Sequence, residues 1–84
     1  MYYVYVLRSK KDSMLYTGST NDLKARVKRH NDGRVKATHS RMPLELIYYE
    51  ACKNNKDARR REMYLKTAWV KRYIRNRLKD YLNE

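Results

Sequence analysis

Two β-rich segments flank a short polar stretch near the start of the chain, and a helical pattern follows at once. Tyr2 to Arg8 is rich in Tyr and Val, which favours a strand, and Met14 to Gly18 reads as a returning strand. Ser9 to Ser13 between them has the polar character of a turn. We therefore expect an antiparallel hairpin that leads directly into a helix.

The register of this hairpin decides which side chains share a face of the sheet. If the hairpin is centred between Lys10 and Lys11, paired positions sum to 21, and Tyr5 lies directly opposite Tyr16. Both rings are then expected on one face, with Cβ atoms about 5 Å apart. A slip of one residue would separate the rings, and loop length alone does not exclude it.

The rest of the chain predicts further helices and one more strand. A first helix should start at one of the capping residues from Thr20 to Asp22 and should end at Gly33. Leu44 to Glu50 alternates like a third strand, after a basic loop that ends at Pro43. A second helix should begin near Asn54, and a last helix should pack on the sheet. The apolar stripe of that last helix is Val70, Ile74, Leu78 and Leu82.

Charge indicates the class of partner. The chain contains 21 Lys and Arg against 9 Asp and Glu, which gives a formal net charge of +12. The excess is +5 over residues 1–52 and +7 over residues 53–84, so it coats the domain and does not form a tail. Such a surface attracts polyanions, because neutralised phosphates release counterions. Nucleic acid is therefore the expected partner, ahead of an acidic membrane or a soluble surface without a partner.

Length and cysteine content indicate the number of domains and the cellular compartment. Residues 1–84 suffice for one small domain with a single core. The apolar run from Tyr2 to Leu7 is too short to span a bilayer or to serve as a signal core. Cys52 has no second cysteine to pair with, so we expect it to fill core space in a cytoplasmic protein.

Polar side chains interrupt the apolar faces of two predicted helices. The first helix should direct inward Leu23, Arg26, Val27 and His30. The second should direct inward Ala58, Glu62, Leu65 and Trp69. A polar group on such a face costs free energy unless it is paired, so Arg26, His30 and Glu62 require an explanation.

Each of these residues also has an ordinary structural explanation. Glu62 could pair with Arg26 or with Arg59 to Arg61. His30 could be a buried histidine with both ring nitrogens satisfied, and the two tyrosines could be packing residues like others of the nine in the chain. The combination favours a site, because all five side chains would converge at the sheet edge beside the first helix.

Five segments together match one known group of proteins. They are Val4 to Val6, Tyr16 to Gly18, Asn21 to Asn31, Met42 to Leu46 and Ala58 to Lys66. In this order they resemble the GIY-YIG nuclease superfamily, and most nearly its small stand-alone branch of excinuclease-subunit-C-like or endonuclease-like proteins. Val4 replaces the first motif's glycine and Thr17 the second motif's aliphatic residue, but the reacting side chains are kept.

The resemblance implies a fold and a set of site residues. The superfamily fold is a three-stranded antiparallel sheet flanked by helices, so the expected class is α/β in the α+β sense. Tyr5 and Tyr16 match the two motif tyrosines, and Arg26 matches the phosphate-contacting arginine. His30 matches the neighbouring histidine that is frequent in the superfamily, and Glu62 matches the metal-binding glutamate.

The resemblance also implies a metal-dependent DNA endonuclease that leaves 5′-phosphate and 3′-hydroxyl ends, with a role in DNA repair or processing as one setting. Mg²⁺ (or Mn²⁺) is the implied cofactor. Mg²⁺ keeps most of its waters, so Glu62 with phosphate oxygens is an adequate anchor, whereas zinc needs more ligands than two histidines and a cysteine supply. Tyr5 or His30 would orient or deprotonate the attacking water, and Tyr16 would hydrogen-bond the nucleophile or the phosphate.

Six residues are expected to bind the nucleic-acid backbone: Ser19, Thr20, Lys28, Arg34, Lys36 and Lys66. Ser19 and Thr20 could hold a phosphate with helix-end N–H groups or could simply cap the helix. Four basic stretches could bind the backbone non-specifically, and each could equally form a solvated helix or loop face: Arg34-Val35-Lys36, Arg59-Arg60-Arg61, Lys71-Arg72 and Arg75-Asn76-Arg77. Two other functions stay open, namely a non-catalytic module for DNA or RNA and a subunit that needs a protein partner. The sequence does not decide the oligomeric state.

Overall fold

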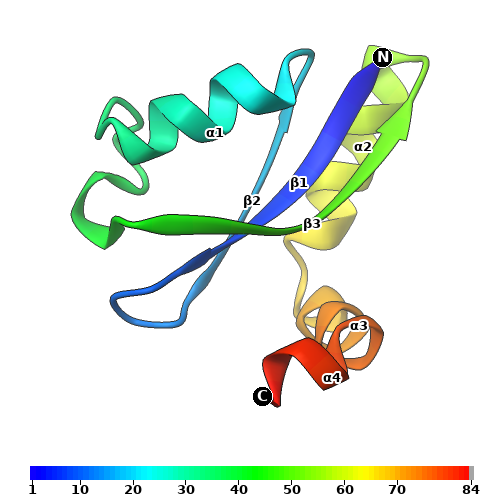
Figure 1. The fold of residues 1–84 in the computed structure, drawn as a ribbon. Coiled ribbons are helices and arrows are strands. Elements are labelled where there is room, and N and C mark those ends of the chain that lie inside the picture. The colour runs from blue at the N-terminus through cyan, green and yellow to red at the C-terminus, as the bar shows by residue number, and fades with distance from the viewer. Residues whose placement is uncertain (84) are drawn as a thin grey trace.

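The computed structural model describes residues 1–83, without the side chains of residues 68–70. Strands β1 (Tyr2–Ser9), β2 (Leu15–Thr20) and β3 (Leu44–Cys52) form one antiparallel sheet in the order β2-β1-β3. Helix α1 (Leu23–Asn31) covers one face, and α2 (Asn55–Leu65) with α3 (Ala68–Arg77) covers the other (Figure 1). A short 3₁₀ turn, His39–Arg41, precedes β3, and α4 (Lys79–Leu82) follows α3. The predicted α+β class, with a three-stranded antiparallel sheet flanked by helices, is confirmed.

The core lies on both faces of β1, the central strand. Val4 and Val6 pack against α2 and α3, together with Ile74. Tyr5 and Leu7 point to the opposite face, where α1 lies. Because both faces are covered, β1 reads as a continuous apolar run, without the polar alternation of a half-exposed strand.

The hairpin register differs from the predicted one by two residues. Tyr5 pairs with Gly18, and Tyr16 pairs with Leu7. The prediction that Tyr5 lies directly opposite Tyr16 is therefore wrong. A shift of two residues preserves the facing of every side chain, so both tyrosines still lie on the α1 face.

Side chains within the turn account for this register. The Ser9 backbone N–H donates to the Met14 carbonyl at 2.9 Å, which sets the last pair of the hairpin. Ser9 Oγ accepts from the backbone N–H groups of Lys11 and Asp12, and Asp12 Oδ1 accepts from that of Met14. Ser13 completes the turn in the left-handed region, at φ 62°. These local hydrogen bonds favour a longer turn than one centred between Lys10 and Lys11.

Both ends of α1 follow from local sequence. Asp22 is the N-cap, and its Oδ1 accepts from the Ala25 N–H at 3.1 Å. The chain leaves the helix through Gly33, at φ 76°, whose N–H donates to the His30 carbonyl. Glycine adopts this left-handed conformation without a Cβ clash, so the predicted end is confirmed. Thr20 is the last residue of β2 and not the cap.

The C-terminal helices break at places that the apolar stripes did not predict. The second stripe implied one helix as far as Trp69, but α2 ends at Leu65 and α3 begins at Ala68. Thr67 interrupts them in an extended conformation, at ψ 163°. The predicted last helix is likewise two helices, which meet at Leu78. Ile74 and Leu78 pack on the sheet as expected, whereas the side chains of Trp69 and Val70 lie outside the described residues.

Cys52 is a free, half-buried thiol that packs beside the core on the α2 face, as expected. None of the helices in the described part of the chain is long and apolar enough to cross a bilayer.

A partly buried ion pair joins β3 to α2. Arg61 donates from Nε and Nη2 to the two carboxylate oxygens of Glu50, both at 2.9 Å, and the Tyr48 hydroxyl donates to Glu50 Oε2. The Arg61 guanidinium also lies 5.1 Å from the Tyr64 ring centre and 5.2 Å from that of Tyr73. Hydrogen bonds from Arg61 hold the pKa of Glu50 below its usual value. This cluster therefore fixes α3, which carries Tyr73, against α2 and the sheet.

We predict that Arg61→Leu lowers the free energy of unfolding by about 1–2 kcal/mol, because a half-buried carboxylate loses a bidentate partner. Arg60→Leu is the matched control, since Arg60 pairs with Asp57 at the surface and its side chain is 77% exposed. That control should change stability by less than about 0.5 kcal/mol. Urea denaturation of both variants measures the difference, and equal losses would contradict a special role for the Arg61 cluster.

Candidate active site

A pocket of about 370 Å³ opens at the outer edge of β2, between α1 and α2. Its lining residues are Tyr5, Tyr16, Gly18, Ser19, Arg26, Arg59, Glu62 and Met63. Four of the five predicted catalytic side chains therefore meet in one pocket. The fifth, His30, is completely buried and lies behind Tyr5.

The pocket straddles β2, so it joins the two faces of the sheet. Tyr16 and Gly18 lie on the α1 face, because they pair with Leu7 and Tyr5, whereas Ser19 lies on the α2 face. Gly18 has no side chain on the α1 face, and the Tyr5 ring lies against its backbone there. A Cβ at Gly18 would lie 2.5 Å from the Tyr5 hydroxyl oxygen, far inside van der Waals contact, so the Tyr5 ring occupies the space that any other residue would fill.

A buried chain of hydrogen bonds holds Tyr5 from behind. The Tyr5 hydroxyl lies 2.8 Å from His30 Nε2, and His30 Nδ1 lies 2.7 Å from Thr38 Oγ1. All three residues are 0% exposed. Because hydroxyls donate and accept, either ring nitrogen of His30 can carry the proton. Both nitrogens have partners in either case, as the structural explanation of His30 expected.

The pKa values assign different roles to Tyr5 and His30. Burial, and secondly the charge of Arg26, lowers the pKa of His30 from 6.5 to about 4, so its ring is neutral at pH 7. Burial raises the pKa of Tyr5 above 10.0, although Arg26 opposes this shift. Transfer of the Tyr5 proton to His30 is therefore strongly unfavourable, because burial raises the pKa of the donor and lowers that of the acceptor. His30 is better suited to orient the hydroxyl than to take its proton.

Arg26 faces the pocket with hydrogen-bonding capacity to spare. Its Nε–H donates to the Tyr5 hydroxyl at 3.3 Å, and this contact raises the pKa of Arg26. No carboxylate pairs with Arg26 among the described residues. A guanidinium has five N–H donors, so Arg26 can bind an oxyanion without breaking an ion pair.

Glu62 enters the pocket from α2 as an ionised carboxylate. Its Oε1 accepts from Ser19 Oγ at 2.5 Å, and its Oε2 accepts from Lys66 Nζ at 2.8 Å. Burial raises the pKa of Glu62, but the hydrogen bonds from Lys66 and Ser19 outweigh it and hold the pKa below its usual value. The expected alternative partners were Arg26 and Arg59 to Arg61, but the ion pair is with Lys66 and Arg61 binds Glu50.

The donors of the pocket suit a magnesium ion better than zinc. Within the described residues no three His, Cys, Asp or Glu side chains gather in a metal-binding cluster. Zinc needs three or four such ligands. Mg²⁺ binds hard oxygens and is held by one or two carboxylates together with water and phosphate. Glu62 fits this pattern, because each of its oxygens keeps a second lone pair.

The structure places the six predicted nucleic-acid-binding residues unevenly. Ser19 and Lys66 come to the site through their contacts with Glu62. Lys28 instead pairs with Asp32 at 2.7 Å on the exposed side of α1. The remaining three, which lie at the end of β2 and in the loop after α1 and do not line the pocket, are Thr20, Arg34 and Lys36.

Sequence reasoning missed several residues of the site. Met63 lies beside Glu62 on α2 and was not singled out, whereas Arg59, which also lines the pocket, was expected as a partner of Glu62 or as a contact to the nucleic-acid backbone. Gly18 belongs to the second tyrosine motif, but its role in making room for the Tyr5 ring depends on the register. Thr38 lies in an irregular loop, where no periodic pattern indicates a buried partner for His30.

A larger pocket, of about 590 Å³, lies on the other flank of α1. Tyr3, Val27, Leu46 and Tyr49 supply much of its wall, and Asp22 and Lys24 are its charged residues. The Asp22 carboxylate already caps α1. Four of the five predicted catalytic side chains thus lie in the smaller pocket at the β2 edge, and none of them lines the larger one.

Comparison with known proteins agrees with the fold described above. The family model described as GIY-YIG catalytic domain matches residues 1–73. A UPF0213 protein of Clostridium perfringens is 48% identical over 67 residues, which cover 79% of this chain and 71% of that protein. One of Bacillus licheniformis is 39% identical over 83 residues, which cover 94% and 84%. The solution NMR structure of a UPF0213 protein from Bacillus halodurans shares 35% identity, with a TM-score of 0.54 over 88% of this chain and 82% of that chain.

We predict that the buried His30 makes the fold sensitive to acid. Its pKa is lower in the folded chain than in the unfolded chain, so the unfolded state binds the proton first as pH falls from 6.5 to about 4. The free energy of unfolding should fall by roughly 2 kcal/mol through this window. Urea denaturation between pH 7 and pH 4.5 should show this slope in the wild type and in His39→Gln, but a smaller slope in His30→Gln. An unchanged slope in His30→Gln would refute the prediction.

We predict that Gly18→Ala destabilises the fold by about 1–3 kcal/mol, because the added methyl group meets the Tyr5 ring. The same change in a Tyr5→Leu background should cost at least about 1 kcal/mol less, since the hydroxyl end of the ring is gone. A double-mutant cycle by thermal denaturation measures this coupling. Equal costs in the two backgrounds would show that the contact does not limit residue 18.

Proposed function

Because the chain belongs to the GIY-YIG catalytic domain family, we propose that it is a metal-dependent endonuclease. It hydrolyses phosphodiester bonds in DNA and leaves 5′-phosphate and 3′-hydroxyl ends. One observation carries the proposal, namely that Tyr5, Tyr16, Arg26 and Glu62 line a single pocket at the edge of β2. The formal net charge of +12 also supports the proposal, because a positive surface attracts a polyanion such as DNA.

Arg26 binds a non-bridging oxygen of the scissile phosphate. Its guanidinium has free N–H donors in the pocket, and charge-assisted hydrogen bonds to phosphate are strong and directional. Negative charge on the phosphoryl oxygens grows during attack, so a fixed cation stabilises the transition state more than the bound substrate.

Tyr5 orients the attacking water through its hydroxyl, and it accepts the water's proton as a phenolate, after its own proton has left to solvent. In the free protein the Tyr5 hydroxyl is covered, with Arg26 Nε at 3.3 Å and His30 Nε2 at 2.8 Å. A phosphate that draws Arg26 toward itself frees a lone pair of this hydroxyl for water. Since burial raises the pKa of Tyr5, its basicity at neutral pH depends on the positive charges around it. Tyr16, half-buried on the same wall, hydrogen-bonds the water or the phosphate.

Glu62 anchors Mg²⁺ or Mn²⁺ through its ionised carboxylate. When bound, the divalent ion would supply Lewis-acid stabilisation of the phosphoryl oxygen and the leaving 3′ oxygen. Ser19 fixes the Glu62 rotamer through its hydrogen bond to Oε1. Lys66 occupies Oε2 in the free protein and is close enough to turn to a phosphate when substrate arrives.

The expected setting is the cytoplasm, where the free thiol of Cys52 stays reduced. A non-catalytic nucleic-acid-binding module is the alternative function, and the strong positive charge favours it equally. Binding therefore cannot separate the two functions, and cleavage can.

The decisive measurement is cleavage of nicked, branched and single-stranded DNA with MgCl₂ or MnCl₂. We predict that Glu62→Gln and Arg26→Gln each lower the cleavage rate at least about 100-fold, because each removes a charge aimed at the reacting phosphate. Matched controls are Glu45→Gln and Arg29→Gln, whose residues do not line the pocket. These should stay within about twofold of the wild type. Circular dichroism confirms that each variant is folded.

Two outcomes would overturn this function. A wild-type protein that binds DNA but cuts no substrate with any divalent ion favours the non-catalytic module, or a subunit that needs a protein partner. Cleavage that survives Glu62→Gln would place the active site elsewhere.

A further inference from the structure

Three hollows follow the outer edge of β2, beginning at the candidate active site. The active-site pocket and the second pocket share Tyr16, and the second and third pockets share Leu15. The second and third pockets measure about 210 and 400 Å³. A strand rises about 3.3 Å per residue, so the part of this line from Ser19 to Leu15 is about 13 Å long. The hollows are therefore neighbours along a path from the active site toward the C-terminal helices.

Cations line this path, and acids do not. Lys66 and Lys71 belong to the second pocket, and Arg8, Arg75 and Lys79 belong to the third. No Asp or Glu is among the described residues that line either pocket. Lys66 pairs with Glu62, but no ion pair neutralises the other four cations in the described part of the chain. The name basic track is used below for Lys71, Arg75, Lys79 and Arg8.

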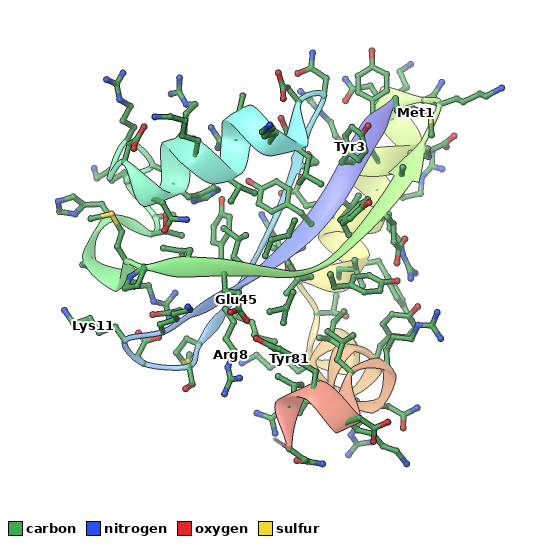
Figure 2. All side chains as sticks on the ribbon, viewed as in Figure 1. Met1, Tyr3, Arg8, Lys11, Glu45 and Tyr81 are labelled. Carbon is green, nitrogen blue, oxygen red and sulfur yellow. The ribbon has the colours of Figure 1, made fainter. Side chains whose placement is uncertain are left out.

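The basic track draws on elements that are far apart in the sequence. Lys71 and Arg75 lie one turn apart on α3, and Lys79 follows four residues later in α4. Arg8 reaches the third pocket from β1, where it is half-buried, and Figure 2 shows it between the hairpin and the C-terminal helices. A solvated helix face would explain the first three residues, but it does not explain an arginine from the sheet in the same hollow.

Unneutralised like charges repel each other, so their convergence costs some stability. Like-charge pairs at i, i+4 cost a few tenths of a kcal/mol each. Three other cations, Lys28, Arg60 and Arg61, each have a carboxylate partner. The four cations of the basic track instead converge on adjoining hollows that no carboxylate lines among the described residues, and this arrangement fits an anionic ligand that is itself a line of charges.

We infer that the basic track holds the backbone of one DNA strand on one side of the scissile phosphate. The placement of a scissile phosphate at the active-site end of the track rests on the proposed function. At about 3.4 Å of rise per nucleotide in a duplex strand, 13 Å corresponds to about four phosphates. The contacts are with phosphates and not with base edges, so they set the position of the strand and leave its sequence unread.

The test compares two triple variants of equal charge. Lys71→Gln/Arg75→Gln/Lys79→Gln removes the three helical cations of the track and keeps Arg8. Arg29→Gln/Lys53→Gln/Lys56→Gln removes one Arg and two Lys that line none of the three pockets. Both are made in the Glu62→Gln background, so that the DNA is not cut. All six replaced side chains are exposed, and both variants should remain folded.

The probes are a fluorescent 20-nucleotide single strand and a nicked duplex, with Kd measured from 50 to 300 mM KCl. Each lost phosphate contact should reduce the slope of log K against log salt by about 0.9 on duplex DNA and about 0.7 on the single strand. We predict that the track variant loses about two to three contacts and binds at least about 30-fold more weakly at 100 mM KCl. The affinity of the control variant should fall less than about threefold, and its salt slope should change by less than the amount expected for about one lost phosphate contact.

Equal losses in the two variants would overturn the basic track, because general attraction would then suffice. Absence of binding by the unsubstituted Glu62→Gln protein at 50 mM KCl would overturn it as well. These outcomes are separate from the nuclease proposal. If the wild type never cuts DNA but the two triple variants show the predicted difference in salt slope, the nuclease proposal fails and the basic track stands. If the wild type cuts DNA but the two triple variants lose equal affinity, the nuclease proposal stands and the basic track fails.

Discussion

The hydrogen bond between Tyr5 and His30 is the interaction on which the candidate site depends. It joins the central strand to α1 inside the core, and Thr38 holds His30 from the other side. Three polar side chains without exposed surface are tolerable only when they satisfy one another. The Tyr5 ring can make this bond only because Gly18 leaves room for it on the edge strand. Removal of either feature would displace the phenol and the guanidinium that rests on it.

Ion pairing distinguishes Arg61, which has a structural role, from Arg26 and the cations of the basic track. Arg61 is neutralised by Glu50 and locks α3 against the body of the protein. Arg26 contacts phenols instead of a carboxylate, and the basic track contains no acidic residue. Cations that remain unpaired gain most from a partner that arrives from solution. Arg26 and the four cations of the basic track are the ones that line adjoining hollows from the active-site pocket toward α3 and α4.

Local patterns predicted the elements better than the joins between them. Apolar periodicity and the capping residues identified α1, including its end at Gly33 and the inward facing of Arg26 and His30. The hairpin register was wrong by two residues, because Ser9 and Asp12 build a longer turn with their side chains. The break between α2 and α3 was also missed, since an apolar stripe does not reveal an extended residue such as Thr67.

The sequence by itself determined the family, the order of strands and helices, and the residue types of the site. Those properties follow from motifs and periodicities that a few neighbouring residues carry. Only the tertiary structure decided that Glu62 pairs with Lys66, that Thr38 supports His30, and that Arg8 meets the cations of α3. Such partners lie in different elements or compete within one helix face, so distances in the folded chain select among them.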